Sequence, residues 1–358
     1  MTDGPNPRVM VAVFAVCIAI PLVAGVAGFS MKKSAAEVSD DDKTAATTIP
    51  WFQKFDERFP FRGALIHAYA RTSLAMGVSP SPTVIRGSDG WLYYADDSAL
   101  DDYISASPLS ASELNDWRDA ILQTRDTLRA LGIAYVFVVA PDKHIIYPEH
   151  MPASIHPLRR EHRLEQLTEY LQRTTDVAVV DLRMPLLEAK RQEQVYFRTD
   201  SHWDEAGAYV AYRELLRAAS RQIASLTPAP RSAFRTWTET WEGGDIAEML
   251  GVRRDMHEDV PVVRPAGGWR AHVVEPAPMS EAGFEVGRVV TSIPDPALPR
   301  LLMIRDSFGS RLIPFLSEHF SRAVYLWQMN LDMDDVRTER PTIVIQEIVG
   351  RRLQTYQP

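Results

Sequence analysis

Continuous apolar runs alternate with helix-length segments over most of the chain after residue 100. The apolar runs are Ile133–Ala140, Val177–Leu182, Leu301–Ile304 with its neighbours, Ala323–Trp327 and Thr342–Ile348. Such runs are typical of strands buried on both faces. The segments predicted to be helical are Ser110–Leu131, Leu158–Arg173, Asp204–Ser225 and Phe308–Phe320. Buried strands that alternate with helices predict an α/β fold, with a parallel sheet covered by helices on both faces.

Boundary signals support several of these elements. Ser110 followed by Glu113 is a capping-box pattern, and Gly132 ends the same helix. Asp204 is a favourable N-cap for the helix that follows it. Gly87-Ser-Asp-Gly90 predicts a tight turn that leads into an aromatic strand over 91–94. Between about 226 and 298 the alternation disappears, which predicts an irregular insertion with short strands.

The N-terminus carries an uncharged apolar segment, Val9–Phe29, directly after Arg8. About 20 apolar residues span a bilayer as a helix, whereas the apolar part of a signal peptide is about 7–15 residues long. We therefore expect an uncleaved single-pass anchor. A cleaved signal and a buried soluble helix stay open as alternatives, and Lys32 and Lys33 weakly oppose an N-inside orientation.

Three regions follow from this pattern. Residues 1–33 are expected to form the membrane anchor, or an uncleaved signal. Residues 34–85 are a small, polar linker followed by a short amphipathic helix within Trp51–Met76, for which an interfacial segment on lipid is the alternative. Residues 86–358 form the folded domain with its insertion.

Composition narrows the class of function. The chain has 358 residues, a net charge of −8 and a single cysteine, Cys17. The length suffices for a sizeable core, and the negative charge argues against a nucleic-acid partner. One cysteine excludes an intrachain disulfide framework and a cysteine-based zinc site.

The first candidate for chemistry is Ser307, in the segment Leu301–Gly309. Functional residues of open α/β sheets gather beyond the carboxyl ends of strands, and Ser307 follows an apolar strand directly. Backbone N–H groups at the start of the next helix could face an oxyanion there. The structural alternative is that Ser307 or Asp306 only caps that helix.

The second candidate is the pair Asp200 and His202, just before the helix that begins near Asp204. In an extended stretch residues two apart point to the same side, so the carboxylate can hold the imidazole in one tautomer. Zinc is the competing interpretation, but no cysteines and no H-E-x-x-H helix supply further ligands. Asp200, His202 and Ser307 thus provide an orienting acid, a base and a nucleophile, and no metal or cofactor is expected.

With these motifs the chain resembles the alginate O-acetyltransferases of the AlgJ/AlgX type, which have an SGNH-hydrolase-like fold. The resemblance rests on T-D-S-H-W (199–203), Gly207 and R-D-S-F-G (305–309). Supporting matches are G-S-D-G-W-L-Y (87–93), A-P-D-K-H-I-I-Y-P-E (140–149) and G-G-D-I-A (243–247), so the resemblance covers roughly 86–350. It implies that Asp200 and His202 are the acid and base of a triad, with Ser307 as nucleophile.

The resemblance also implies supporting residues. Lys143 and Tyr147 follow the first buried strand and are candidates for substrate binding or a structural role; plain surface exposure of Lys143 is the alternative. Asp245 is expected to shape a loop near the site. Arg305 stands where the family often has Gly, and a basic residue there could favour an acidic glycan. Glu347 and Arg351 are weaker candidates.

The resulting hypothesis is O-acetylation of an extracellular or cell-surface polysaccharide through an acetyl-serine intermediate. The resemblance places the catalytic domain in the bacterial periplasm, anchored in the inner membrane beside a multi-pass membrane acyltransferase that supplies acetyl groups. An acetyl esterase of the same fold differs only in its acceptor. A non-catalytic polysaccharide-binding or assembly protein is the alternative from another class.

Overall fold

The computed structural model describes residues 62–279 and 286–355. The chain divides into two compact units, Met1–Thr72 and Ser73–Pro358, and the second contains all the elements described below except most of helix α3. The predicted anchor and linker lie outside the described residues. Among the residues that are described, no helix is long and apolar enough to cross a membrane.

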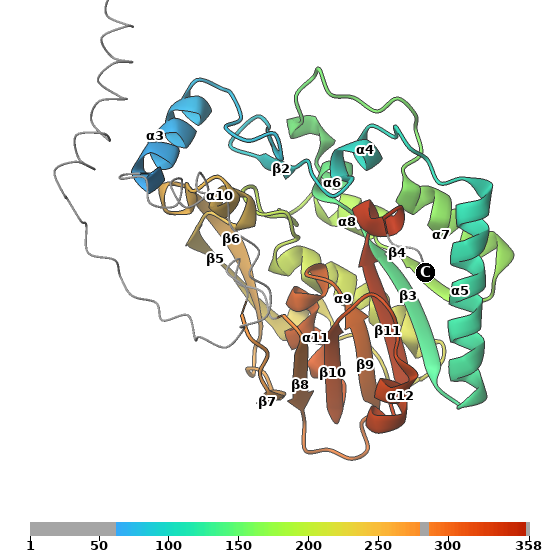
Figure 1. The fold of residues 1–358 in the computed structure, drawn as a ribbon. Helices are drawn as coiled ribbons and strands as arrows, with labels where there is room; N and C mark the ends of the chain where they lie inside the picture. Colours follow the sequence, from blue (N-terminus) through green and yellow to red (C-terminus); the bar gives the residue numbers. More distant parts are fainter. Residues whose placement is uncertain (1–61, 280–285, 356–358) are drawn as a thin grey trace, which may run out of the picture. The chain divides into compact units, whose positions relative to one another are not determined.

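The secondary structure of the described residues is shown in Figure 1. The α-helices are α3 (Arg62–Ala75), α4 (Ala99–Tyr103), α5 (Ala111–Ala130), α6 (Lys143–Ile146), α7 (Arg163–Thr174), α8 (Arg183–Ala189), α9 (Glu205–Ser220), α10 (Asp245–Met249), α11 (Ile313–Ser317) and α12 (Met333–Glu339). The 3-10 helices are η1 (Pro148–His150), η2 (Arg231–Ala233), η3 (Arg253–Asp255), η4 (Phe308–Leu312) and η5 (Gly350–Leu353). The strands are β1 (Val84–Arg86), β2 (Leu92–Tyr94), β3 (Ala134–Ala140), β4 (Ala178–Asp181), β5 (Phe234–Glu242), β6 (His257–Pro265), β7 (His272–Glu275), β8 (Arg288–Ser292), β9 (Arg300–Arg305), β10 (Arg322–Trp327) and β11 (Ile343–Val349).

The main sheet has seven strands in the order β4-β3-β11-β9-β10-β8-β7. The first five run parallel, as the apolar runs predict. The prediction of a wholly parallel sheet is wrong at the other edge, because β8 pairs antiparallel with β10, and β7 antiparallel with β8. Both of these antiparallel strands come from the 226–298 region. That region is also more regular than expected, since β5 and β6 form a nine-residue antiparallel hairpin.

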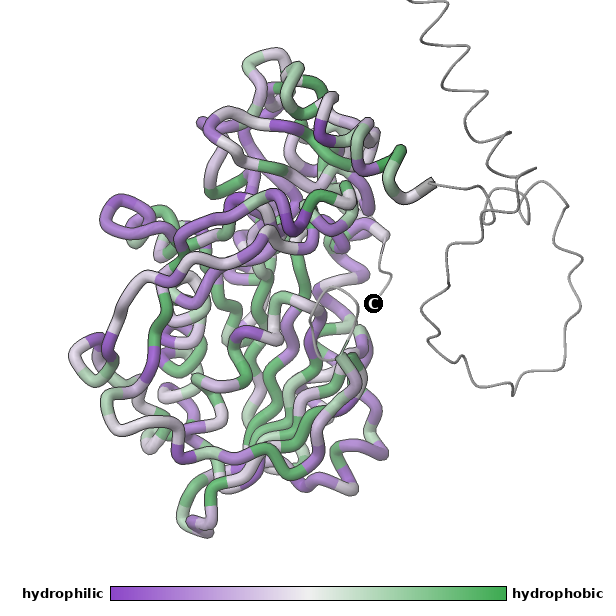
Figure 2. The backbone as a smooth tube through the Cα atoms, turned by 90° about the vertical axis from the view of Figure 1, so that its left-hand side faces the viewer, coloured by the Kyte–Doolittle hydropathy of each residue, from purple (hydrophilic) through white to green (hydrophobic). Residues whose placement is uncertain are grey.

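Both faces of the parallel strands are buried, as predicted. Val136 and Val138 of β3 pack with α9 and α11, whereas Phe137 and Val139 of the same strand pack with α5 and α7. The alternation follows from the period of two along a strand. Figure 2 shows the hydrophobic colouring along the strands of the central sheet.

Several element boundaries differ from prediction, for identifiable reasons. The capping box of α5 is confirmed, with Ser110 Oγ accepting from Glu113 N at 3.2 Å. Helix α7 begins at Arg163 and not at Leu158, whose N–H donates instead to Ile104 O at 2.8 Å. The helix expected over 308–320 is a 3-10 turn followed by the short α11. Helix α3 has no apolar face, so the expected amphipathicity is wrong for this part of the segment, and residues 51–61 lie outside the described residues.

The parallel register brings three strand ends to one edge. Ala140 of β3 pairs with Val349 of β11, and β11 runs in register beside β9, which ends at Arg305. The segments that follow these strands carry Asp142 and Lys143, Gly350 and Arg351, and Asp306 and Ser307. The carboxyl ends of β3, β11 and β9 therefore define the place where the candidate chemistry gathers.

Candidate active site

Two segments meet at this edge, the His202 loop (Tyr196–Trp203) and the Ser307 turn (Arg305–Gly309). The loop is closed at its base by an antiparallel bridge between Tyr196 and Trp203. Helix α9 follows, and Asp204 caps it as predicted, accepting from Ala206 N at 2.9 Å and Gly207 N at 3.0 Å. Trp203 joins the two segments, because its indole N–H donates to Phe308 O at 3.1 Å.

His202 lies between Asp200 and Ser307. Its Nδ1 is 2.7 Å from Asp200 Oδ1, and its Nε2 is 2.7 Å from Ser307 Oγ. Asp200 Oδ1 also accepts the backbone N–H of His202 at 2.9 Å, which fixes the carboxylate relative to the ring. Asp200 and His202 are buried, whereas Ser307 is partly exposed. The sequence therefore brings together an orienting carboxylate, an imidazole and a hydroxyl in hydrogen-bonded order.

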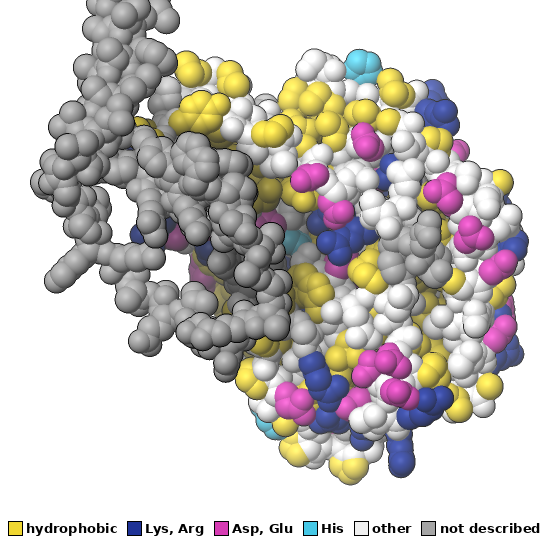
Figure 3. Space-filling model, in the orientation of Figure 1, with side chains coloured by type: hydrophobic (Ala, Val, Ile, Leu, Met, Phe, Trp, Pro, Cys, Tyr) yellow, Lys and Arg dark blue, Asp and Glu magenta, His cyan; other side chains and the backbone are white. Residues whose placement is uncertain are grey.

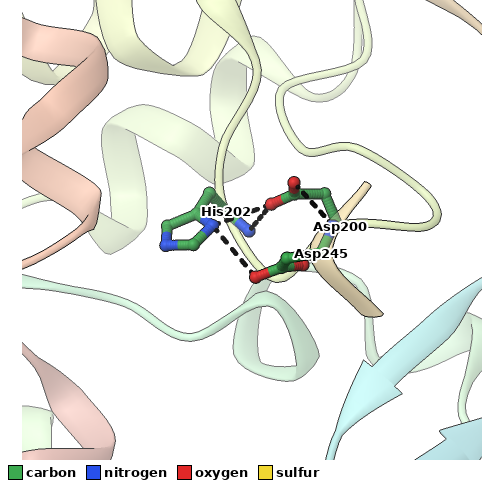
Figure 4. Close-up of side chains that lie close together, drawn as sticks. All are labelled: Asp200, His202 and Asp245. Atoms are coloured by element: carbon green, nitrogen blue, oxygen red, sulfur yellow. Dashed lines mark hydrogen bonds and ion pairs between the residues drawn. The ribbon is translucent and has the colours of Figure 1, made fainter. Parts of the chain in front are cut away.

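A second carboxylate, Asp245 at the start of α10, reaches the same imidazole (Figure 4). Its Oδ2 is 3.4 Å from His202 Nδ1. Ser201 bridges the two groups, since its Oγ donates to Asp245 Oδ2 at 2.5 Å and lies 3.1 Å from His202 Nδ1. Asp245 Oδ1 accepts from Ser201 N at 2.6 Å, and Asp245 N donates to Asp200 Oδ2 at 3.1 Å.

The two carboxylates differ in their electrostatics. Burial acts to raise the pKa of Asp200, but the charge of His202 and its hydrogen bond outweigh burial and hold that pKa below its ordinary value. Burial and the neighbouring Asp200 raise the pKa of Asp245. Asp200 is thus the carboxylate that stays ionised beside the imidazole, and Asp245 accepts a proton more readily.

Side chains from other elements shape the His202 loop from outside. Lys143 is buried, so the alternative of surface exposure is wrong. Its Nζ donates to three carbonyls of the loop, Phe197 O at 3.2 Å, Arg198 O at 3.0 Å and Asp200 O at 2.7 Å. Burial lowers the pKa of Lys143 to about 8.

The Ser307 turn is held by the strand beside it. Asp306 Oδ1 accepts from Phe308 N at 2.9 Å and Asp306 Oδ2 from Val349 N at 2.8 Å. Asp306 N donates to Glu347 Oε2 at 3.1 Å. Glu347 is buried, and burial together with Asp306 raises its pKa well above the ordinary value. Ser307 therefore projects from a turn whose backbone is tied to β11.

Arg305 and Tyr147 lie inside the protein. Arg305 is fully buried, and its guanidinium donates to Asp306 O at 3.1 Å and Ser310 Oγ at 2.8 Å. Tyr147 stacks on Trp91 at 4.3 Å between ring centroids, and its hydroxyl accepts from Val195 N at 3.0 Å. Arg305 thus holds the Ser307 turn from within, and Tyr147 packs against Tyr196 at the start of the His202 loop. Contact of substrate with Lys143, Tyr147, Arg305 or Asp245 stays a prediction.

Arg351 belongs to the same buried layer. Its Nη1 is 2.5 Å from Asp142 Oδ1, and its backbone N–H donates to Asp142 Oδ2 at 2.8 Å. Its guanidinium lies over the ring of Phe308, 5.6 Å from the centroid. This pair connects the ends of β3 and β11 below the Ser307 turn.

Asp200, His202 and Asp245 are the described residues that could supply a cluster of metal ligands. One donor atom from each lies within 4.8 Å of the others. These atoms already satisfy one another, because Nδ1 of His202 lies against Asp200 and Ser201. The other imidazole nitrogen, Nε2, is hydrogen-bonded to Ser307, which favours proton transfer over metal binding.

The sequence interpretation missed Thr199, Gly244, Glu258 and Arg311. Glu258 of β6 accepts from Arg198 N at 2.6 Å and Thr199 N at 3.0 Å. Gly244 N donates to Thr199 Oγ1 at 2.9 Å, and a Cβ on Gly244 would collide with the side chain of Asp200. The doubled glycine before Asp245 was the available signal for such a close approach.

The chain is similar to known proteins in sequence and in fold. The family model described as "SGNH hydrolase-like domain, acetyltransferase AlgX" matches residues 84–267. A probable alginate O-acetylase AlgJ of Pseudomonas syringae is 31% identical over 202 residues, covering 55% of this chain and 48% of that protein. The AlgJ of Azotobacter vinelandii is 28% identical over 346 residues, covering 90% of this chain and 84% of the relative. The chain thus spans about half the length of the first of these relatives.

Solved structures share the fold. The O-acetyltransferase domain of Pseudomonas putida AlgJ superposes with a TM-score of 0.51 at 21% identity, covering 78% of this chain and 94% of that one. Bacillus cereus PatB1 gives a TM-score of 0.58 at 15% identity, covering 75% and 96%. The expected SGNH-hydrolase-like α/β fold is confirmed, with a mixed sheet in place of a parallel one.

Proposed function

This chain belongs to the family of SGNH hydrolase-like, AlgX-type acetyltransferases, and on that premise we propose that it acetylates hydroxyl groups of a polysaccharide through an acetyl ester on Ser307. The observation that carries the proposal is the hydrogen-bonded series from Asp200 through His202 to Ser307, with both links at 2.7 Å. A positioned base within hydrogen-bond reach of a serine hydroxyl is the arrangement that activates this nucleophile.

In the first half-reaction His202 Nε2 takes the proton of Ser307 Oγ as that oxygen attacks the acetyl carbonyl of the donor. The imidazolium is stabilised by Asp200, whose carboxylate keeps Nδ1–H directed away from the serine. The oxyanion that forms is stabilised by backbone N–H groups at the Ser307 turn other than those of Asp306 and Phe308, which already donate to carboxyl oxygens. When the bond to the donor's leaving group breaks, His202 returns the proton to that group, and Ser307 carries the acetyl ester.

In the second half-reaction a sugar hydroxyl attacks the acetyl-serine. His202 Nε2 takes the proton of this hydroxyl, and the new tetrahedral intermediate collapses to the acetylated sugar. The proton then returns from His202 to Ser307 Oγ, which restores the enzyme. An esterase would use the same residues with water as acceptor, so the acceptor must be identified by experiment.

The proposal also includes a place for the reaction. The apolar segment 9–29 would anchor the chain in the bacterial inner membrane, with the folded domain in the periplasm. A multi-pass membrane acyltransferase would supply acetyl groups from the cytoplasm, and the acceptor would be an exported polysaccharide. The names of the AlgJ relatives support alginate as one acceptor to test.

The test follows a chromogenic acetyl ester by absorbance and the intact protein by mass spectrometry, with and without sugar oligomers. We expect a mass increase of one acetyl group that Ser307→Ala abolishes, and a fall of about 10³-fold or more in ester cleavage for Ser307→Ala and His202→Ala. Ser112→Ala, at an exposed position of α5, is the matched control.

The acceptor then decides the outcome. Transfer of the acetyl group to sugar supports the transferase. Loss of the adduct to water at one rate with and without sugar would make the protein an esterase. Absence of any adduct would leave the non-catalytic binding protein.

A further inference from the structure

Strand β5 carries two tryptophans around a glutamate, of which Trp237 and Glu239 are exposed and Trp241 is half-buried. Trp237, Glu239 and Trp241 are two residues apart and so share one side of the strand. Their side chains are connected, because Trp237 Nε1 donates to Glu239 Oε1 at 2.7 Å and Trp241 Nε1 to Glu239 Oε2 at 3.0 Å. Trp237 is 43% exposed, which is unusual for so large an aromatic side chain with no core to fill. We call these three residues the β5 row.

Glu239 keeps its charge between the two rings. The hydrogen bonds from Trp241 and Trp237 lower its pKa, and the side chain lies in solvent. An ionised carboxylate offers about four lone-pair sites, of which the indoles use two. Glu239 can therefore accept further hydrogen bonds from a ligand while its first two hold the rings in place.

The row leads toward the candidate active site. Trp241 stacks on Phe197 of the His202 loop, with 5.8 Å between ring centroids and planes 25° apart. Arg311 lies over both rings, 4.5 Å from the centroid of Phe197 and 5.7 Å from that of Trp241. Arg311 belongs to η4, the 3-10 helix that Ser307 caps. Aromatic faces thus continue from the exposed Trp237 to the helix that begins at the nucleophile.

We propose that the β5 row binds a stretch of the polysaccharide that Ser307 acetylates, with sugar rings on Trp237 and Trp241 and sugar hydroxyls on Glu239. The inference rests on the proposed function and names the part of the molecule that recognises the acceptor. Positions 237 and 241 are about 14 Å apart along a strand, which favours an extended glycan over a single sugar.

The charge of Glu239 favours a glycan over other occupants. An apolar protein face or the hydrocarbon of a membrane would have to remove water from this carboxylate without replacing its hydrogen bonds, which is unfavourable. A sugar presents apolar C–H faces to the rings and hydroxyl donors to the carboxylate at once. The face of the protein in Figure 3 carries acidic and basic side chains side by side.

The test measures binding without catalysis. Full-length protein is run by affinity electrophoresis and calorimetry against alginate oligosaccharides and against neutral cello-oligosaccharides of matched lengths. We expect affinity for at least one series to rise with chain length, and Trp237→Ala and Glu239→Gln each to weaken it fivefold or more. Trp237→Phe, which keeps an aromatic face, should stay within about threefold. Thr238→Ala, on the opposite side of the same strand, is the matched control, and thermal melting checks each fold.

A kinetic measurement then separates binding of the oligosaccharide acceptor from the chemical step at Ser307. Trp237→Ala should raise KM for the oligosaccharide acceptor at least fivefold more than it changes cleavage of a small acetyl ester. Wild-type protein that forms acetyl-Ser307 but binds neither oligosaccharide series would overturn the proposed role of the β5 row and leave the proposed function intact. Unchanged oligosaccharide affinity in Trp237→Ala, with altered self-association or liposome binding, would also overturn it. Absence of acetyl-Ser307 tests the proposed function separately.

Discussion

The His202 loop and the Ser307 turn are supported in different ways. Contacts from three other elements hold the loop, with Lys143 from α6, Gly244 and Asp245 from α10 and its N-cap, and Glu258 from β6. The turn is held mainly by the neighbouring strand β11, through Val349 N and Glu347. The position of the acid and base therefore depends on distant side chains, and that of the nucleophile on local strand geometry.

The His202 loop and the Ser307 turn also differ in the charge of the groups that hold them. The loop turns three carbonyls toward one ammonium, an arrangement that is stable only while a donor occupies the centre. The turn uses backbone N–H groups and the buried carboxyl group of Glu347, whose pKa is raised by burial. We expect substitutions around the loop to disturb the proposed chemistry far more than substitutions around the turn.

Lys143→Met should have the largest effect. It removes the cation from three inward carbonyls and leaves them unsatisfied, which costs about 3 kcal/mol or more in the free energy of unfolding. With the loop loosened, formation of acetyl-Ser307 should fall by about 10²-fold, since small misplacements of catalytic groups are costly. Denaturant unfolding and single-turnover mass spectrometry measure the two effects. A stable variant with wild-type turnover would show that the loop holds its shape without Lys143.

Gly244→Ala should follow in size. The added methyl group would collide with Asp200 and push that carboxylate away from His202. Overpacking of this kind costs about 1–3 kcal/mol, and we expect acetyl-Ser307 formation to fall by a comparable factor, about tenfold to hundredfold. Gly267→Ala is the matched control, because a Cβ there meets open space. Equal effects of the two substitutions would argue against a steric role for Gly244.

The contrast between these regions also explains what the sequence could predict. Ser307 was found because an apolar run that ends in Asp-Ser places the hydroxyl at a sheet edge, and Asp200 and His202 because residues two apart share a side. Glu258 was not found, since it depends on the β5–β6 register, and both strands lie where the alternating pattern is absent. The direction of β7 and β8 was missed because local apolarity does not encode whether a strand pairs parallel or antiparallel.

Raising the pH should affect turnover, which depends on the His202 loop, differently from the stability of the fold. Lys143, with its pKa lowered by burial to about 8, loses its proton as the pH rises through that value. The neutral amine has two N–H donors for three carbonyls, so turnover should decline above about pH 8. The unfolded chain keeps this proton up to about pH 10.5. Between pH 8 and 10.5 the unfolded chain therefore binds more protons than the folded protein, and the contribution of Lys143 to the free energy of unfolding rises with pH.

Acetyl-Ser307 formation and thermal melting, followed together from pH 7 to 10, check this opposition. Wild-type turnover should fall severalfold without a matching loss of stability attributable to Lys143. The residual turnover of Lys143→Met should lack the decline. A decline of the same size in that variant would assign the alkaline effect to another group.

Glu347→Gln, a substitution beside the Ser307 turn, should have the smallest effect of those considered. Burial and Asp306 raise the pKa of Glu347 and so favour its neutral form. Glutamine is also neutral, and it keeps the shape of the side chain and the carbonyl oxygen that accepts from Asp306 N. We expect a change below about 1 kcal/mol in the free energy of unfolding and less than threefold in turnover. Glu347→Ala, which removes the acceptor and leaves a cavity, is the matched variant and should destabilise by about 2 kcal/mol or more. A large loss in Glu347→Gln would mean that a charge acts at this position, and the Ser307 turn would then depend on buried ionic contacts as the His202 loop does.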